Sequence, residues 1–179
     1  MKAHETIQAT LKGKRMIHGD AVVARRWAHV GLLGGGTGIA PLVQIARILL
    51  RDPADSTRVR VLSVNRTEAD ILMRAELDGL AAAHPDRFQV AYCLTAPPAE
   101  GWTGFTGRGS VEMIREALPP AGDGTRMVLL CGRDGFVETW AGPMGRAQNP
   151  DGSKGGKIQG PLKGLLADAG YDASEVYKY

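Results

Sequence analysis

The stretch over residues 29–50, HVGLLGGGTGIAPLVQIARILL, most constrains what this chain can fold into. It begins with a short apolar run, of the kind typical of a strand buried on both faces of a sheet. Three glycines, a threonine and a fourth glycine follow, and a helically spaced apolar run then starts at a proline, a residue suited to a first helical turn. The stretch therefore predicts a strand over 29–34, a tight turn, and a helix over 41–50.

The turn itself has the pattern G-x-G-x-x-P, carried by Gly36, Gly38 and Pro41. Glycine lets the backbone come close to a ligand because it has no Cβ, and the N-terminus of a helix adds a positive dipole end. The pattern favours a phosphate-binding turn. The alternative is a strand-to-helix turn that uses glycine for steric reasons alone.

Along the rest of the chain, segments with a strand-like apolar pattern alternate with segments of helical spacing. Strands are predicted over 58–65, 87–95, 126–132 and 175–179, and helices over 67–84, 111–118, 136–145 and 161–170. Thr67 with Asp70 suggests a capping box, and Ser110 an N-cap. Residues 96–109 and 146–157 are predicted loops, the second one flexible. This order predicts an α/β fold, a doubly wound, five-stranded parallel sheet with helices on both faces.

In such sheets, ligands bind beyond the carboxyl ends of the strands, where the strand order reverses. Segments 34–41, 65–67 and 131–136 follow predicted strands and are therefore the candidate site. Dinucleotide folds often place an acidic residue after the second strand, but Asn65 and Arg66 stand there in this chain. An arginine at this place suits a 2′-phosphate. The alternative is an arginine in a solvent-facing loop.

Composition excludes several function classes. Two cysteines, Cys93 and Cys131, make no disulfide framework, and the four histidines lack metal-ligand spacing, so no metal site is expected. There is no P-loop or serine-hydrolase motif, no apolar run long enough for a membrane span, and no signal peptide is expected. A net charge of +3 fits an anionic ligand or an acidic partner, or simply a solvated surface, and no nucleic-acid partner is expected.

Several motifs in order then point to a known family: GGGTGIAPL, NRTEADILMRAEL, PDRFQVAYCL, MIREALPP, LLCG and the final VYKY. Together, over residues 28–179, they resemble the NAD(P)H-binding domain of cytochrome-b5 reductase, within the wider ferredoxin-NADP reductase family. The resemblance implies an oxidoreductase domain that binds NADH or NADPH. It also implies hydride transfer to FAD, and then electron transfer to a haem protein such as cytochrome b5. In that family an N-terminal β-barrel with an Arg-x-Tyr-Ser/Thr motif holds most of the flavin, and this chain contains no such motif.

Site residues carry over by position. The resemblance implies that the turn lines the diphosphate and nicotinamide side, with Thr37 also facing the flavin, and that Cys131 lies beside the reactive nicotinamide carbon. Cys131 and Thr37 are thus the expected catalytic residues. The resemblance also places Tyr179, a terminal aromatic, near the active site. The expected cofactor-binding set is Gly35, Gly36, Thr37, Gly38, Pro41, Asn65, Arg66, Thr95, Cys131, Gly132, Asp134 and Phe136.

The chain departs from the family pattern at three places. The family's Cys-Gly-Pro-Pro segment reads CGRDGF, so Arg133 and Asp134 replace prolines that would fix the backbone, and a looser nicotinamide loop is expected. Thr95 stands where NADH-preferring relatives often carry an aspartate, which leaves NADPH open. Ser110 aligns with an aromatic residue that packs near adenine.

Two domain-level hypotheses follow. Residues 1–27, with Lys12, Lys14, Arg15, Arg25 and Arg26, are expected to be a basic arm or the remnant of a flavin domain, and 28–179 the nucleotide-binding domain. The arm either steers an acidic acceptor, touches an anionic membrane, or is a solvated leftover. The chain is then the incomplete NAD(P)H-binding half of a flavoenzyme that works with a separate flavin barrel. The alternative is a non-catalytic nucleotide-binding or interaction module. A cytoplasm-facing location is expected, and association with the endoplasmic reticulum or the outer mitochondrial membrane is left open.

Overall fold

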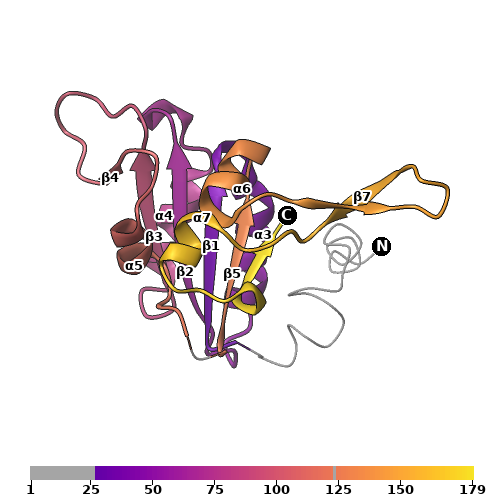
Figure 1. Cartoon of the computed structure of the whole chain (residues 1–179). Coiled ribbons are helices and arrows are strands. Elements are labelled where there is room, and N and C mark those ends of the chain that lie inside the picture. Colours follow the sequence, from indigo (N-terminus) through magenta and orange to yellow (C-terminus); the bar gives the residue numbers. More distant parts are fainter. Residues whose placement is uncertain (1–26, 123) are drawn as a thin grey trace, which may run out of the picture.

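A computed structural model describes residues 27–122 and 124–179, so the predicted basic arm lies outside the described residues but for Trp27. Its centre is a six-stranded, all-parallel sheet in the order β4-β3-β2-β1-β5-β8 (Figure 1). The strands are β1 (His29–Gly35), β2 (Arg58–Asn65), β3 (Phe88–Leu94), β4 (Phe105–Thr106), β5 (Arg126–Cys131) and β8 (Val176–Lys178). The helices are α3 (Ile39–Arg51), α4 (Arg74–Ala83), α5 (Val111–Ala117), α6 (Asp134–Ala141) and α7 (Gly164–Asp168). The predicted α/β doubly wound sheet is confirmed, with its five expected strands present.

The two faces of the sheet bury separate cores. Alternate residues of β1 point to opposite faces, so that Leu32 packs among the side chains of α3 and Leu33 among those of α5, α6 and α7. The apolar stripe of α3 is buried, and Leu77 of α4 joins the same core. Each face is therefore covered by helices, which explains why β1 has a continuous apolar sequence.

The strand order reverses at β1. The chain runs outward from β1 through β2 and β3 to β4, and then crosses back to place β5 on the other side of β1. Both neighbours of β1 are parallel to it. The reversal lies between β1 and β5, and the predicted glycine turn leaves the sheet at this point.

Two segments predicted as loops contain strands. In 96–109, the short strand β4 pairs with Cys93 and Leu94 at the sheet edge and makes the sixth strand. The prediction of a flexible loop over 146–157 is wrong, because β6 (Gly145–Gln148) and β7 (Lys154–Ile158) form an antiparallel hairpin that projects from the body (Figure 1). Its turn is closed by a bond from the Gly152 amide to the Asn149 carbonyl, 2.9 Å. The sequence NPDG at 149–152 suits such a turn. The flanking residues lack the apolar alternation that predicts strands, so the hairpin was not expected from the sequence.

The predicted helix over 67–84 is also wrong at its start. The capping box at Thr67 and Asp70 exists, but it caps a single 3-10 turn, Glu68–Asp70. Ile71 is then extended and buried, and Met73 adopts φ +57 before α4 begins at Arg74. A capping box indicates only where a helical turn begins and does not determine how far the helix extends. Here the extended, buried Ile71 separates the capped turn from α4. Likewise, α6 ends before Gly142, which has φ +78, and α7 is shorter than its predicted 161–170.

A buried lysine holds the base of the hairpin. Lys178 is only 2% exposed, and its Nζ lies 3.0–3.4 Å from five backbone carbonyl oxygens that share its three N–H donors. These are the carbonyls of Ala141, Gly142, Pro143, Gly160 and Pro161. Burial lowers the pKa of this ammonium. The Gln159 side chain also bonds both the amide and the carbonyl of Lys178. The ammonium thus ties the chain entering and leaving the hairpin to the last strand.

Replacing Lys178 with Met should destabilise the fold, because the carbonyls around Nζ would lose a shared buried donor. We expect a loss of about 2–4 kcal/mol in the free energy of unfolding, measured by urea denaturation. Lys154→Met removes an exposed lysine from the same hairpin and should change stability by less than about 0.5 kcal/mol. Equal effects of the two substitutions would contradict the role given to Lys178.

Candidate functional site

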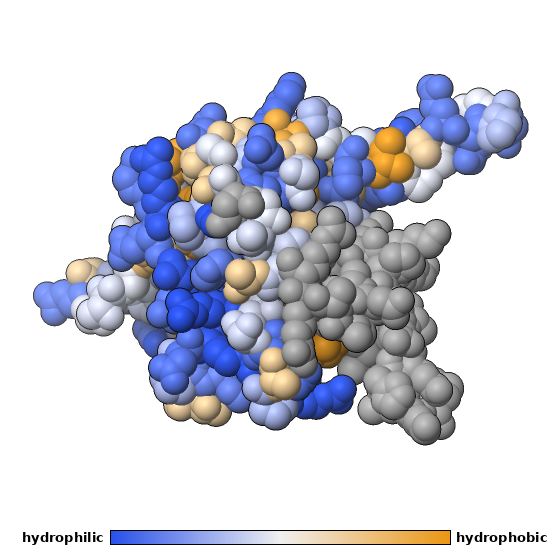
Figure 2. Space-filling model, turned by 90° about the horizontal axis from the view of Figure 1, so that it is seen from below, coloured by the Kyte–Doolittle hydropathy of each residue, from blue (hydrophilic) through white to orange (hydrophobic). Residues whose placement is uncertain are grey.

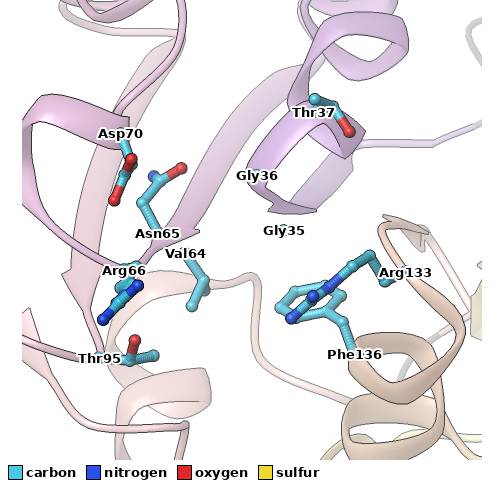
Figure 3. Close-up of a pocket in the computed structure, with 10 residues that line it drawn as sticks. All are labelled: Gly35, Gly36, Thr37, Val64, Asn65, Arg66, Asp70, Thr95, Arg133 and Phe136. Carbon is cyan, nitrogen blue, oxygen red and sulfur yellow. The ribbon is translucent and has the colours of Figure 1, made fainter.

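A cleft of about 440 Å³ opens at the carboxyl ends of β1, β2 and β3, beside the start of α6 (Figure 3). Its walls come from four separate stretches of sequence. The lining residues are Gly35, Gly36, Thr37, Val64, Asn65, Arg66, Asp70, Thr95, Arg133 and Phe136. The cleft therefore lies at the edge of the sheet predicted to bind a ligand.

Strand register explains why these residues meet. Gly35 pairs with Val64, Gly34 with Cys131, and Asn65 with Leu94. The next residues along each chain therefore leave the sheet at nearly the same level. The three segments singled out from the sequence, 34–41, 65–67 and 131–136, are brought together in this way.

The glycine turn needs glycine at two positions for two reasons. Gly36 has φ +54, a conformation that other residues rarely adopt, and a Cβ there would point into open space. Gly38 is confined instead, because a Cβ would lie 2.1 Å from the carbonyl oxygen of Cys131. The turn (Gly36–Gly38) leads directly into α3, and the first amides of a helix lack intrahelical partners. The turn thus presents backbone donors and a positive dipole end to the cleft.

Asn65 presents an unused acceptor. The residue is 5% exposed, and its Nδ2 donates to the Ser63 hydroxyl over 3.1 Å. Its Oδ1 is buried and accepts no hydrogen bond from any described residue. Figure 3 shows this oxygen turned toward the glycine turn. A buried acceptor without a donor is unfavourable, so the position is suited to a ligand that brings a hydroxyl or amide proton.

The wall beside Asn65 carries both signs of charge. The Asp70 carboxylate accepts from the Thr67 hydroxyl at 2.7 Å and the Thr67 amide at 2.9 Å. These bonds, helped by the nearby Arg66 charge, lower the pKa of Asp70. Asp70 is therefore ionised at neutral pH, and the exposed Arg66 guanidinium lies on the same wall with Thr95 (Figure 3).

The opposite wall is aromatic. A Cβ on Gly35 would lie 2.8 Å from the Phe136 ring, and one on Gly132 would lie 2.5 Å from it. The ring therefore rests directly on both glycines, and it also contacts Trp140 with centroids 5.6 Å apart. Phe136 gives the cleft an apolar surface next to the carboxyl end of β5.

Cys131 and Tyr179 follow paired residues of the neighbouring strands β5 and β8, at the carboxyl ends of these strands, and neither residue lines the cleft. Leu130 pairs with Lys178, and the Tyr179 amide donates to the Leu130 carbonyl at 2.9 Å. Both side chains pack on the α3 face of the sheet. Burial raises the pKa of the Cys131 thiol, so the group is uncharged at neutral pH. This state agrees with the expected role of a compact neutral group, and the role itself stays a prediction.

The predicted site residues divide into three groups. Gly35, Gly36, Thr37, Asn65, Arg66, Thr95 and Phe136 line the cleft. Four others do not line the cleft: Gly38 lies in the turn before α3, Pro41 in the first turn of α3, Cys131 at the end of β5, and Gly132 directly after it. Asp134 borders a separate, smaller cavity, and its carboxylate pairs with Lys157 Nζ of the hairpin at 2.7 Å.

Val64, Asp70 and Arg133 also line the cleft, although none of them is among the expected cofactor-binding residues. Asp70 was visible only as a capping residue, and Arg133 only as a departure from a proline. Their place at the carboxyl ends of β2 and β5 was the available signal, but the strand register was needed to use it.

Metal-ligating clusters and membrane-spanning helices are both absent from residues 27–122 and 124–179. In this part of the chain, no three His, Cys, Asp or Glu side chains are grouped to hold a metal ion. No helix in it has the length and apolarity to cross a membrane. Both cysteines are free thiols.

Comparison with known proteins agrees with this geometry. Residues 32–141 match the family model described as the oxidoreductase NAD-binding domain. The chain is 38% identical over 151 residues to NADH-cytochrome b5 reductase 2 of Aspergillus clavatus, covering 84% of this chain and 44% of that protein. It is 43% identical over 115 residues to the human protein of that name, covering 64% of this chain and 41% of the human protein.

Solved structures show the same fold. The cytochrome b5 reductase domain of Ulva prolifera nitrate reductase superposes with a TM-score of 0.67 at 29% identity, covering 86% of this chain and 50% of that one. The chain thus spans less than half the length of the curated relatives named above.

The two thiols should react slowly with iodoacetamide. Burial raises the pKa of Cys93 to about 11 and also raises that of Cys131, and a raised pKa means less reactive thiolate at a given pH. At pH 8 we expect about one Cys93 in a thousand to be thiolate. Labelling followed by mass spectrometry between pH 7 and 9 should show rates that rise throughout. A rate at Cys131 that is already maximal at pH 7 would contradict this environment.

Proposed function

The chain belongs to the family of oxidoreductase NAD-binding domains, and from that premise we propose that it is the NAD(P)H-binding half of a flavoenzyme similar to cytochrome b5 reductase. The whole enzyme would pass a hydride from NADH or NADPH to FAD, and single electrons from there to a haem protein. The observation that carries the proposal is the cleft itself. It combines a glycine turn at the start of α3 with a buried, unused acceptor at the reversal point of the sheet.

The residues present fit a dinucleotide. The Gly36–Gly38 turn at the start of α3 would hold the diphosphate with backbone amides. The Asn65 Oδ1 would accept from a ribose hydroxyl, which satisfies the atom left without a donor. Arg66 and Thr95 would lie against the adenosine ribose, and Phe136 would give the nicotinamide end an apolar surface.

The chemistry would come from the cofactors, and the protein would position them. When bound, FAD would be the acceptor of the hydride that leaves the nicotinamide. Thr37 lines the cleft on the side proposed to face the flavin. Cys131, uncharged because burial raises its pKa, would pack near the nicotinamide without adding a charge. Hydride transfer itself needs no general acid or base from this chain.

A second reading is a nucleotide-binding module without catalysis. The observation that favours it is the CGRDGF loop, in which Asp134 turns to Lys157 of the hairpin and not to the cleft. Both readings require nucleotide binding, and they differ in whether electrons leave the nucleotide.

We further propose that the flavin is held mainly by a β-barrel domain and that the acceptor is a haem protein such as cytochrome b5. The names of the relatives support the second point. Attachment of the whole enzyme to the endoplasmic reticulum or the outer mitochondrial membrane is part of the same proposal.

Calorimetric titration with NADH and NADPH tests the binding step. Gly36→Ala should weaken binding of both about tenfold, because it adds strain at φ +54 and a methyl group beside the diphosphate. Gly79→Ala, at an open position inside α4, is the matched control and should leave binding unchanged. Absence of binding by the unaltered, folded chain would overturn the proposed function.

Reduction of ferricyanide by NADH or NADPH, with added FAD, separates the two readings. Turnover by the chain alone, or after addition of a flavin-binding barrel from a relative, supports the flavoenzyme. Tight nucleotide binding with no turnover in either case supports the non-catalytic module.

The substitution Thr95→Asp tests whether position 95 affects the preference of the cleft for NADH or NADPH. A carboxylate beside Arg66 would repel a 2′-phosphate, so we expect NADPH affinity to fall about tenfold or more and NADH affinity to change by less than about threefold. Titration of the variant with both nucleotides measures this directly. Equal losses for the two would show that position 95 does not contact the ribose.

A further inference from the structure

We propose that Arg133 binds the diphosphate of the dinucleotide, acting from the β5 side of the cleft as a second anion-binding group beside the glycine turn. This inference rests on the proposed function and deepens it. It assigns a binding role to a residue that replaces a proline in the motif the chain resembles.

Register sets the position of Arg133. Gly34 pairs with Cys131 across β1 and β5, so Gly36 and Arg133 both lie two residues beyond the same level of the sheet. Both line the cleft. Figure 3 shows the Arg133 side chain extending from the start of α6 toward the cleft, next to Gly35 and Phe136. A diphosphate held by the turn amides would therefore lie within reach of this guanidinium.

The Arg133 side chain is free to bind a ligand. It is exposed, and among the described residues its guanidinium has no hydrogen-bond or ion-pair partner. The neighbouring carboxylate does not neutralise it, because Asp134 pairs with Lys157 at 2.7 Å. The replacement of two prolines by Arg133 and Asp134 thus leaves one positive charge at the cleft and directs the negative charge to the hairpin.

The chemistry of the group suits the diphosphate better than the other parts of a dinucleotide. A guanidinium presents paired donors that match phosphate oxygens in a bidentate way. The nicotinamide and adenine rings carry no charge. Under the proposed function, a 2′-phosphate would lie at the wall of Arg66 and Thr95, and this wall is across the cleft from Arg133 (Figure 3).

The backbone of Arg133 allows a matched substitution. Its φ of −62 and ψ of 156 are values that proline adopts without strain. Arg133→Pro therefore removes the guanidinium while restoring the residue of the related motif and keeping the turn. Arg133→Gln provides a second variant that retains a long polar side chain without the charge.

The experiment compares two nucleotide fragments by calorimetric titration of the full chain. ADP-ribose contains the diphosphate, whereas 2′-AMP carries only a 2′-phosphate. We expect Arg133→Pro and Arg133→Gln to weaken ADP-ribose binding about tenfold, the contribution of one charge-assisted hydrogen bond, and to leave 2′-AMP binding within about twofold. Arg66→Ala should show the reverse pattern. Lys154→Ala, which removes one positive charge from the hairpin tip, should change neither.

Each other outcome overturns something specific. If the unaltered chain binds ADP-ribose and both Arg133 variants bind it equally well, Arg133 does not contact the diphosphate. If the variants lose ADP-ribose and 2′-AMP alike while circular dichroism shows them folded, the residue shapes the whole cleft and the assignment to the diphosphate is wrong. If the unaltered chain binds neither fragment, the proposed function fails, and this inference fails with it.

Discussion

The parallel pairing of β1 with both β2 and β5 is the constraint on which the site depends. It places the ends of three strands at one level, so that the residues that follow them share one cleft. It also brings the glycine turn against the end of β5, where Gly38 faces the Cys131 carbonyl at a distance that no side chain allows. A larger residue at Gly38 would therefore push the start of α3 away from the end of β5 and displace the glycine turn.

This geometry explains how a small domain can hold a large anionic ligand without burying charged side chains. Backbone amides at the start of α3 provide part of the positive potential. The arginines at the cleft, Arg66 and Arg133, are exposed and therefore carry their charge at little desolvation cost. Asn65 is the exception, because it is buried with one oxygen lacking a donor. The protein alone leaves that atom unsatisfied, and a ribose hydroxyl would complete it.

The far edge of the sheet follows a different principle. There a single ammonium, Lys178, collects carbonyls from both sides of the hairpin and attaches them to the last strand. An isolated two-stranded hairpin is only marginally stable in water. The contacts of Lys178 at its base therefore stabilise the position of this hairpin. The same hairpin receives Asp134 through Lys157, which connects it to the loop that carries Arg133. The Asp134–Lys157 pair therefore lies on the surface between the hairpin and the start of α6, next to the residue that lines the cleft.

The sequence by itself determined the fold class, the glycine turn and the edge of the sheet at which the cleft opens, because these depend on local periodicity and on turn chemistry within a few residues. It also identified most of the cleft, including Asn65, Arg66 and Phe136. It could not show that the helix predicted from Thr67 would break at Met73, that polar residues 145–158 would pair as strands, or that Asp134 would turn from the cleft to Lys157. Tertiary structure decided these points, because each depends on a contact between residues far apart in the chain. The place of Asp70 at the cleft was settled in the same way, and so was the difference between Arg133, which lines the cleft, and Asp134, which does not.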